Sequence, residues 1–190
     1  LGLGGAKLLD ALDYEPDIYH LNEAHAVSSI FHLYNKYKSV EKIREKMVFT
    51  THTPEEAGNE KHDINLLENL SFFDGIPLEI VREITGIQDN TFNHSLVALR
   101  LSHKANGVSK LHGEVSRDMW KDFTGICPIT HITNAQNKKY WVDPWLDDAH
   151  ASKDREELIN RKKRLKTKLF EVVADQTGKI FDPEILTIVW

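Results

Sequence analysis

The chain has 190 residues, of which 41% are hydrophobic and 28% charged, with a formal net charge of −5. This composition is typical of a folded soluble chain, and the negative charge does not favour nucleic acid as a partner. Cys127 is the only cysteine, so an internal disulfide and a cysteine-based zinc cluster are excluded, which fits a reducing, cytoplasmic compartment. No stretch approaches the ~20 apolar residues of a membrane span, and no signal peptide opens the chain.

A first helix is expected over residues 2–12, where Leu8, Leu9 and Leu12 recur at helical spacing. The glycines at its start resemble part of a phosphate-cradling loop. However, no strand precedes them and the third glycine is misplaced for the dinucleotide fingerprint. The sequence therefore favours a tight turn at a helix start.

Four short apolar runs each end in a cluster of histidine, asparagine, threonine or acid. A buried run followed by polar residues and then a helical pattern is typical of a βα unit. We predict an α/β fold with a Rossmann-like parallel sheet and flanking helices. Its polar clusters converge beyond the carboxyl ends of the strands. The four segments are 17–25, 47–53, 107–114 and 129–134.

Helices are also predicted over residues 26–38, 66–73, 78–84 and 92–104, with a polar, mobile loop at 55–62. His32 is expected on the flank of its helix rather than in the site. His94 and His103 fall within a helical pattern and are interpreted as structural or surface residues.

A long charged helix is predicted from about residue 153 to 174 and looks like a connector. Its basic run at 161–168 follows two acidic residues on the same helix and contains no interleaved aromatic, so we interpret it as a solvated face rather than a nucleic-acid site. Residues 185–190 are apolar and β-branched, which predicts a buried strand. Because the chain starts without methionine and stops in that strand, we expect a fragment of a longer protein.

The polar clusters allow more than one chemistry. Glu23 with His25, and His112 with Glu114, together with His52 and His131, offer metal ligands, so a metal-dependent hydrolase is one alternative. Their spacing matches no specific metal signature, and we expect no bound metal.

Nucleophilic catalysis has less support. The sequence has no G-x-S-x-G elbow, and Cys127 lies between apolar Ile126 and Pro128, which favours burial. A polyhydroxylated ligand fits the asparagine, histidine, threonine and glutamate side chains of the polar clusters best, because sugar hydroxyls both donate and accept hydrogen bonds. A non-catalytic glucan-binding module is a further alternative.

The chain resembles the α-glucan phosphorylases, the glycogen, starch and maltodextrin phosphorylases, most closely their short microbial type. Several stretches carry this resemblance in the family's order over essentially the whole chain. They are residues 1–5, 20–26, 48–54, 96–116 and 132–134 with Trp141 beyond them.

The resemblance implies a retaining glycosyltransferase of two Rossmann-like domains, a GT-B-like architecture, with the active site between them. Such enzymes transfer a terminal glucosyl unit from an α-1,4-glucan to phosphate, giving glucose 1-phosphate, and use pyridoxal phosphate. The cofactor lysine and the phosphate-binding residues belong to the second domain, so the cofactor is expected outside this chain. The isolated chain is then not expected to be a complete enzyme, and its self-association stays open.

Residue by residue, the resemblance implies that His25 is a catalytic histidine that hydrogen-bonds the glucosyl unit. Asn134 would contact the same group, although Ala135 replaces the glycine that usually follows it. If that glycine needs a positive φ, alanine would strain the loop. Five further residues match family motifs as possible supporting groups: Asn22, Glu23, His52, His112 and Glu114.

The resemblance also implies a domain organisation. Residues 1–150 would be the later part of an N-terminal glucan-binding domain, residues 151–180 a connector helix, and residues 181–190 the first strand of a C-terminal domain.

Overall fold

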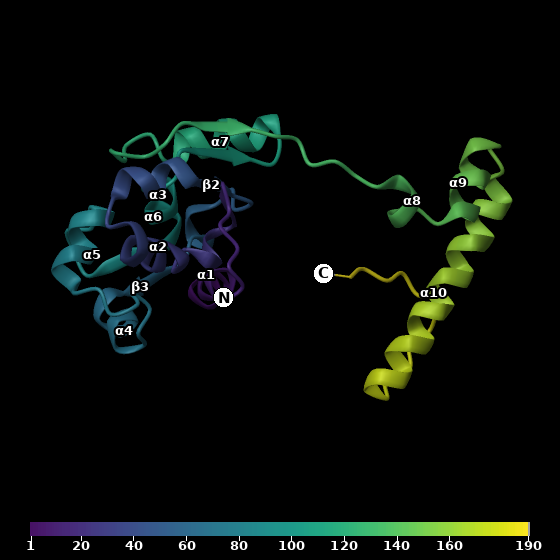
Figure 1. Ribbon diagram of the computed structural model, residues 1–190. Coiled ribbons are helices and arrows are strands. Elements are labelled where there is room, and N and C mark those ends of the chain that lie inside the picture. Colours follow the sequence, from purple (N-terminus) through teal and green to yellow (C-terminus); the bar gives the residue numbers. More distant parts are fainter. Residues whose placement is uncertain (190) are drawn as a thin grey trace. The chain divides into compact units, whose positions relative to one another are not determined.

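The structure is a computed structural model that describes residues 1–189. It divides into two compact units, residues 1–134 and residues from Ala135 onward. None of the helices in the described range is long and apolar enough to cross a membrane. The first unit is α/β, with a sheet and flanking helices, and the second is helical (Figure 1).

The strands of the first unit form two sheets. A four-stranded sheet has the order β1-β2-β5-β6 with every neighbouring pair parallel, and β3 and β4 form an antiparallel pair. The strands are β1 (Tyr19–Asn22), β2 (Met47–Thr50), β3 (Lys61–Asp63), β4 (Thr91–Asn93), β5 (Lys104–Gly107) and β6 (Ile129–His131). The predicted parallel α/β sheet is therefore confirmed.

Helices connect these strands. Those of the first unit are α1 (Gly2–Ala11), η1 (Ala24–Ala26), α2 (Ser29–Tyr37), α3 (Val40–Lys46), η2 (Glu56–Gly58), α4 (Ile64–Asn69), α5 (Leu78–Thr85), α6 (His94–Arg100) and α7 (Lys110–Met119). Side chains cap several of their N-termini, as the preference for Ser, Asp and Asn there predicts. Ser39, Asp63, Asn93 and Ser109 each accept a backbone N–H of the first turn.

The core of the first unit lies between the parallel sheet and these helices. Phe31, Phe49, Phe92 and Leu99 are fully buried. At the start of α1, a Cβ on Gly2 would overlap the carbonyl oxygen of Ala26. Glycine is therefore needed there for close packing of α1 on η1, and not for a turn.

Two predicted segments of the first unit differ from the structure. The helix predicted over 92–104 is shorter in the structure, where only α6 (His94–Arg100) is helical. Asn93 caps its start, and the chain enters β5 at Lys104. The loop predicted over 55–62 contains η2 and the start of β3. Both differences arise because strands of three or four residues are too short for the alternation of apolar and polar residues to be recognised.

The second unit consists of α8 (Lys138–Trp141), α9 (Pro144–Ala151) and α10 (Arg155–Thr177). The predicted long charged helix is confirmed as α10, which has no buried residue. Asp143 at the start of α9 accepts two hydrogen bonds from Arg161 of α10, at 2.9 and 2.6 Å. The same guanidinium lies 4.4 Å from the Trp145 ring centre, so α9 and α10 are joined by charge and stacking.

The buried strand predicted over 185–190 is wrong for its described part. Residues 185–189 form no strand, and Leu186 and Ile188 are more than 80% exposed. A β-strand needs a neighbouring strand to accept its backbone hydrogen bonds, and the second unit has none in its described residues. Trp190 lies outside the described residues.

A charged cluster fastens α1 to α2 and to the turn after α4. His32 lies with Nε2 2.8 Å from Asp10 and Nδ1 3.2 Å from Asp74, while Lys36 and Lys7 pair with these two carboxylates at 2.6 Å. Hydrogen bonds from Lys36 and then His32 lower the pKa of Asp10. Burial opposes ionisation of Asp74, but the hydrogen bonds from Lys7, His32 and Asn35 outweigh it and lower its pKa.

Replacing Asp74 by asparagine should destabilise the chain by about 1 to 2 kcal/mol at neutral pH, because Lys7 and His32 lose the carboxylate that they share. A carboxyl whose folded pKa is lowered stabilises the fold above its ordinary pKa, and this contribution is lost as the pH falls through the folded value. The difference between wild type and Asp74→Asn should therefore shrink at low pH. Denaturation by urea, at neutral and at low pH, measures the loss of stability and its dependence on pH. Asp118→Asn, which removes an exposed pair with Lys121, is the control and should change little. Equal effects of the two substitutions would contradict the assigned role of Asp74.

Candidate functional site

A row of polar residues crosses the carboxyl edge of the parallel sheet. The register pairs Asn22 with Thr50, Thr50 with Asn106 and Asn106 with Thr130. One step earlier the paired residues are Leu21, Phe49, Ala105 and Ile129, all buried. The four predicted polar clusters therefore do follow neighbouring strand ends, as parallel topology requires.

Hydrogen bonds join this row across three strands. Thr50 donates its hydroxyl to Asn106 Oδ1 at 2.9 Å, and His20 Nε2 lies 2.8 Å from the same hydroxyl. Because a hydroxyl has one proton, which goes to Asn106, His20 must donate to Thr50. The side-chain amide of Asn106 then donates to the carbonyl of Gly107 at 3.2 Å. These bonds fix the strand ends relative to each other.

Glu23 anchors the segment that follows β2. Its carboxylate accepts the backbone N–H of His52, and the hydroxyls of Thr53 and Thr51 lie at 3.3 and 3.5 Å. Glu23 itself has φ 63° and ψ 171°, a strained conformation for a residue with a side chain. Strained backbone of this kind often lies at ligand sites, where neighbouring contacts hold it in place.

His52 is exposed and held by Asn22. Its Nε2 lies 2.7 Å from Asn22 Oδ1, an acceptor, so the ring donates through Nε2. Asn22, Glu23 and His52, predicted as supporting residues, thus contact one another. The other ring nitrogen of His52 remains available to a ligand at the edge.

His25 lies on η1, two residues after the strained Glu23. Its side chain is 65% exposed, and its Nδ1 is 3.9 Å from Glu60 Oε2. Both residues line a small cavity of about 50 Å³ together with Glu23, Thr53 and Ser95. His25 therefore stands at the edge of the sheet with a free face and an acid beside it.

A pair of histidines lies behind His25. His62 Nδ1 is 2.9 Å from His94 Nε2, and His94 is buried against Phe72 and Phe92. Burial lowers the pKa of His94 to about 4, although Glu60 acts in the opposite direction. His94 is therefore neutral at pH 7 and can donate or accept only one hydrogen bond per ring nitrogen.

The two predicted residues of α7 do not join this edge. His112 is buried, and its Nδ1 accepts the backbone N–H of Val108 at 3.2 Å. Glu114 is exposed on the helix. A Cβ on Gly113 would lie 2.9 Å from His131 Cβ, so glycine allows α7 to pack directly on β6. His112 therefore shapes the turn after β5.

Asn134 is tied to that same turn. Its backbone N–H donates to the carbonyl of Val108 at 3.0 Å, and its side chain is exposed. Ala135 is not among the described non-glycine residues with positive φ. The backbone strain considered for alanine at this position is therefore absent from the structure.

Metal binding and nucleophilic catalysis by Cys127 are the two other chemistries that the sequence raises. Within residues 1–189, no group of three or more His, Cys, Asp or Glu side chains is placed to hold a metal ion. Cys127 is buried, and burial raises the pKa of its thiol to about 11, so it is neutral at pH 7 and a weak nucleophile.

Comparison with known proteins gives several partial matches. A maltodextrin phosphorylase of Thermococcus litoralis is 33% identical over 157 residues, covering 75% of this chain and 19% of that protein. A glycogen phosphorylase of Aquifex aeolicus is 32% identical, covering 75% of this chain and 23% of that protein. An uncharacterised protein of Methanocaldococcus jannaschii is 44% identical over the whole chain, which spans 36% of its length. No family model matches the chain.

These matches indicate a phosphorylase-related region and, more coarsely, a relation to glycosyltransferases. The chain spans about a fifth of the length of the phosphorylases that it matches and about a third of the Methanocaldococcus protein.

Sequence reasoning missed several residues of the site. Asn106 lies in β5, which was predicted to begin only after it, so its alignment with Thr50 could not be seen. Glu60 was placed in a loop, and no local pattern links it to His25. Glu60 comes close to His25 only because β3 pairs with β4. In this pairing the backbone N–H of His94 donates to the carbonyl of Glu60.

Lowering the pH from about 6.5 to 4 should destabilise the fold through His94. The unfolded histidine takes a proton in this range, whereas the folded one stays neutral, so stability falls as the pH drops. The loss should be at most about 3 kcal/mol, because the pKa falls from 6.5 to about 4 and each pKa unit corresponds to about 1.4 kcal/mol. His94→Gln should flatten this pH dependence in chemical denaturation. His103→Gln, at an exposed position, serves as the control. An unchanged slope in His94→Gln would show that the ring is not held neutral.

Proposed function

We propose that this chain is the glucan-side portion of an α-glucan phosphorylase, which transfers a terminal glucosyl unit to phosphate and forms glucose 1-phosphate. One observation carries the proposal. A row of amides and hydroxyls crosses four strand ends, and hydrogen bonds join three of these strands, in a chain that is similar over three quarters of its length to proteins named phosphorylases.

The chemistry of the row supports a sugar ligand. The side-chain amides of Asn22 and Asn106 are neutral groups that both donate and accept, as a ring of hydroxyls requires, while buried Thr50 holds Asn106 in place. They lie on strand ends rather than on long loops, so little conformational entropy is lost when a ligand binds.

In this proposal His25 and Asn134 contact the glucosyl unit directly. Both side chains are exposed at the edge, and each is fixed through its backbone: His25 by η1 and Asn134 by its bond to Val108. Glu23 and Asn22 hold the segment with His52 beside them. His112 supports the turn after β5 from inside.

The proposed enzyme is larger than this chain. Residues 1–150 would belong to an N-terminal Rossmann-like domain, 151–180 to a connector, and 181–190 to the start of a second domain in a GT-B-like arrangement. As the resemblance to the phosphorylases implies, pyridoxal phosphate would be held by that second domain. When bound, the cofactor would supply a phosphate group for proton transfer.

The role of this chain is then to orient the glucosyl unit. A positioned hydrogen bond that strengthens as positive charge develops on the sugar ring lowers the barrier. Holding the reacting groups in place also avoids the entropy loss of bringing them together in the transition state.

In the full-length protein that this proposal requires, His25→Ala should lower the rate of glucose 1-phosphate formation from maltoheptaose and phosphate by about 30- to 1000-fold. This corresponds to about 2 to 4 kcal/mol for one hydrogen bond to the transition state. The reverse reaction should fall equally.

The matched control is His103→Ala. His103 is exposed and precedes β5, at the opposite edge of the sheet, where its backbone N–H donates to Met47. It should retain full activity. A wild-type protein that forms no glucose 1-phosphate would refute the proposed function. An active His25→Ala variant with normal stability would remove only His25 from the site.

A further inference from the structure

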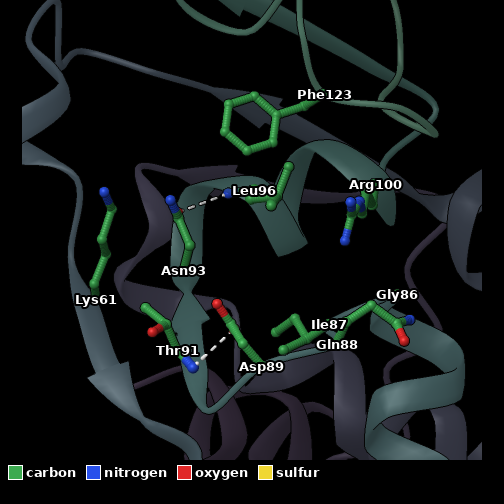
Figure 2. Close-up of a pocket in the computed structure, with 10 residues that line it drawn as sticks. All are labelled: Lys61, Gly86, Ile87, Gln88, Asp89, Thr91, Asn93, Leu96, Arg100 and Phe123. Atoms are coloured by element: carbon green, nitrogen blue, oxygen red, sulfur yellow. Dashed lines mark hydrogen bonds between the residues drawn. The ribbon is translucent and has the colours of Figure 1, made fainter.

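A second cavity lies away from the carboxyl edge of the parallel sheet. It has a volume of about 600 Å³ and is bordered by the β3–β4 pair, the segment after α5, helix α6 and Phe123. Figure 2 shows Arg100 at one end, Lys61 at the other and Phe123 across from Asp89. A cavity of this size suits a small organic molecule.

Arg100 provides an unpaired positive charge in this cavity. Its Nη1 donates to the carbonyl of Thr85 at 2.9 Å and its Nε to the carbonyl of Thr124 at 3.2 Å. These two bonds use only part of the five N–H donors of a guanidinium. Among residues 1–189 it forms no ion pair.

The surroundings hold this guanidinium in place and partly dehydrated. A Cβ on Gly86 would lie 3.0 Å from Arg100 Nη1, so the glycine makes room for the charged group. Burial lowers the pKa of Arg100 from its ordinary value, because the charge has lost water without gaining an acid. A bound anion would supply the missing negative partner for this charge.

The rest of the cavity is divided by polarity. Ile87 and Leu96 are buried apolar residues, and Phe123 is 40% exposed above them. Lys61, at the far end, is already paired with Glu56 at 3.1 Å. Asp89 would repel a second negative charge in the middle of the cavity. The ligand should therefore carry one anionic group and an apolar body.

We propose that this cavity binds a small organic monocarboxylate. Its carboxylate accepts hydrogen bonds from Arg100, and its aromatic or aliphatic body packs against Phe123 and Leu96. The site is independent of the glucan edge and of the proposed phosphorylase activity.

Titration of the 190-residue chain with 4-phenylbutyrate, followed by amide chemical shifts, tests this proposal. Binding in the millimolar range or tighter is expected, with shifts at Gly86, Ile87 and Phe123. The neutral analogue 4-phenylbutanol should bind at least about tenfold more weakly, because it leaves the guanidinium unpaired.

Arg100→Gln should also weaken 4-phenylbutyrate binding about tenfold or more. Arg117→Gln is the matched control, since Arg117 likewise donates to a backbone carbonyl, that of Ile129, but does not border the cavity. If Arg100→Gln fails to fold, Phe123→Ala takes its place and should also weaken binding. The proposal is wrong if the wild-type chain shows no shifts at these residues, if the alcohol binds as well as the acid, or if the folded cavity variants bind like wild type.

Discussion

Parallel pairing of β1, β2, β5 and β6 is the constraint on which the site depends. In a parallel sheet every strand ends at the same edge, so residues distant in sequence meet if the register aligns them. Here the register places Asn22, Thr50, Asn106 and Thr130 in one row, directly after a buried row of apolar residues. A register shift of one residue would turn these side chains to the other face of the sheet. The packing that fixes the core therefore also fixes the site.

Glu23 connects the segment after β1 to the segment after β2 at this edge. Its strained backbone lets the carboxylate reach the segment after β2 and accept the N–H of His52. Conformations of this kind cost about 1 to 3 kcal/mol, and the hydrogen bonds that Glu23 accepts offset that cost. The two neighbouring loops are thus coupled through one side chain. Glu23 is also the N-cap of η1, the short helix that carries His25.

Much of the fold could be predicted because its signals are local. The polar ends of β1, β2 and β6 and the helical spacing of α2, α5 and α10 stand in the sequence directly. β5 was placed too late, since Lys104 and Asn106 interrupt its apolar pattern. The strand predicted over 185–190 failed for a different reason: apolar, β-branched residues favour a strand only where a neighbouring strand can pair with them.

The site was less predictable, because its contacts depend on the sheet. His112 and Glu114 stand close together in a motif, yet α7 turns one into the core and leaves the other exposed. Glu60 approaches His25 only through the pairing of β3 with β4. Arg100 gave no signal in the sequence, because an arginine at a helix end is ordinary and its lack of an acidic partner is a property of the folded chain. Motifs identified the edge, and tertiary structure decided which residues face it.

The central claim is that the polar edge of the parallel sheet binds the terminal glucosyl unit of a glucan. A crystal structure of the full-length protein with maltoheptaose tests it most directly. We expect a terminal glucose ring within hydrogen-bond distance of His25 and Asn134, at the carboxyl ends of β1 and β6. An ordered oligosaccharide bound elsewhere, with these two side chains facing only solvent, would contradict it.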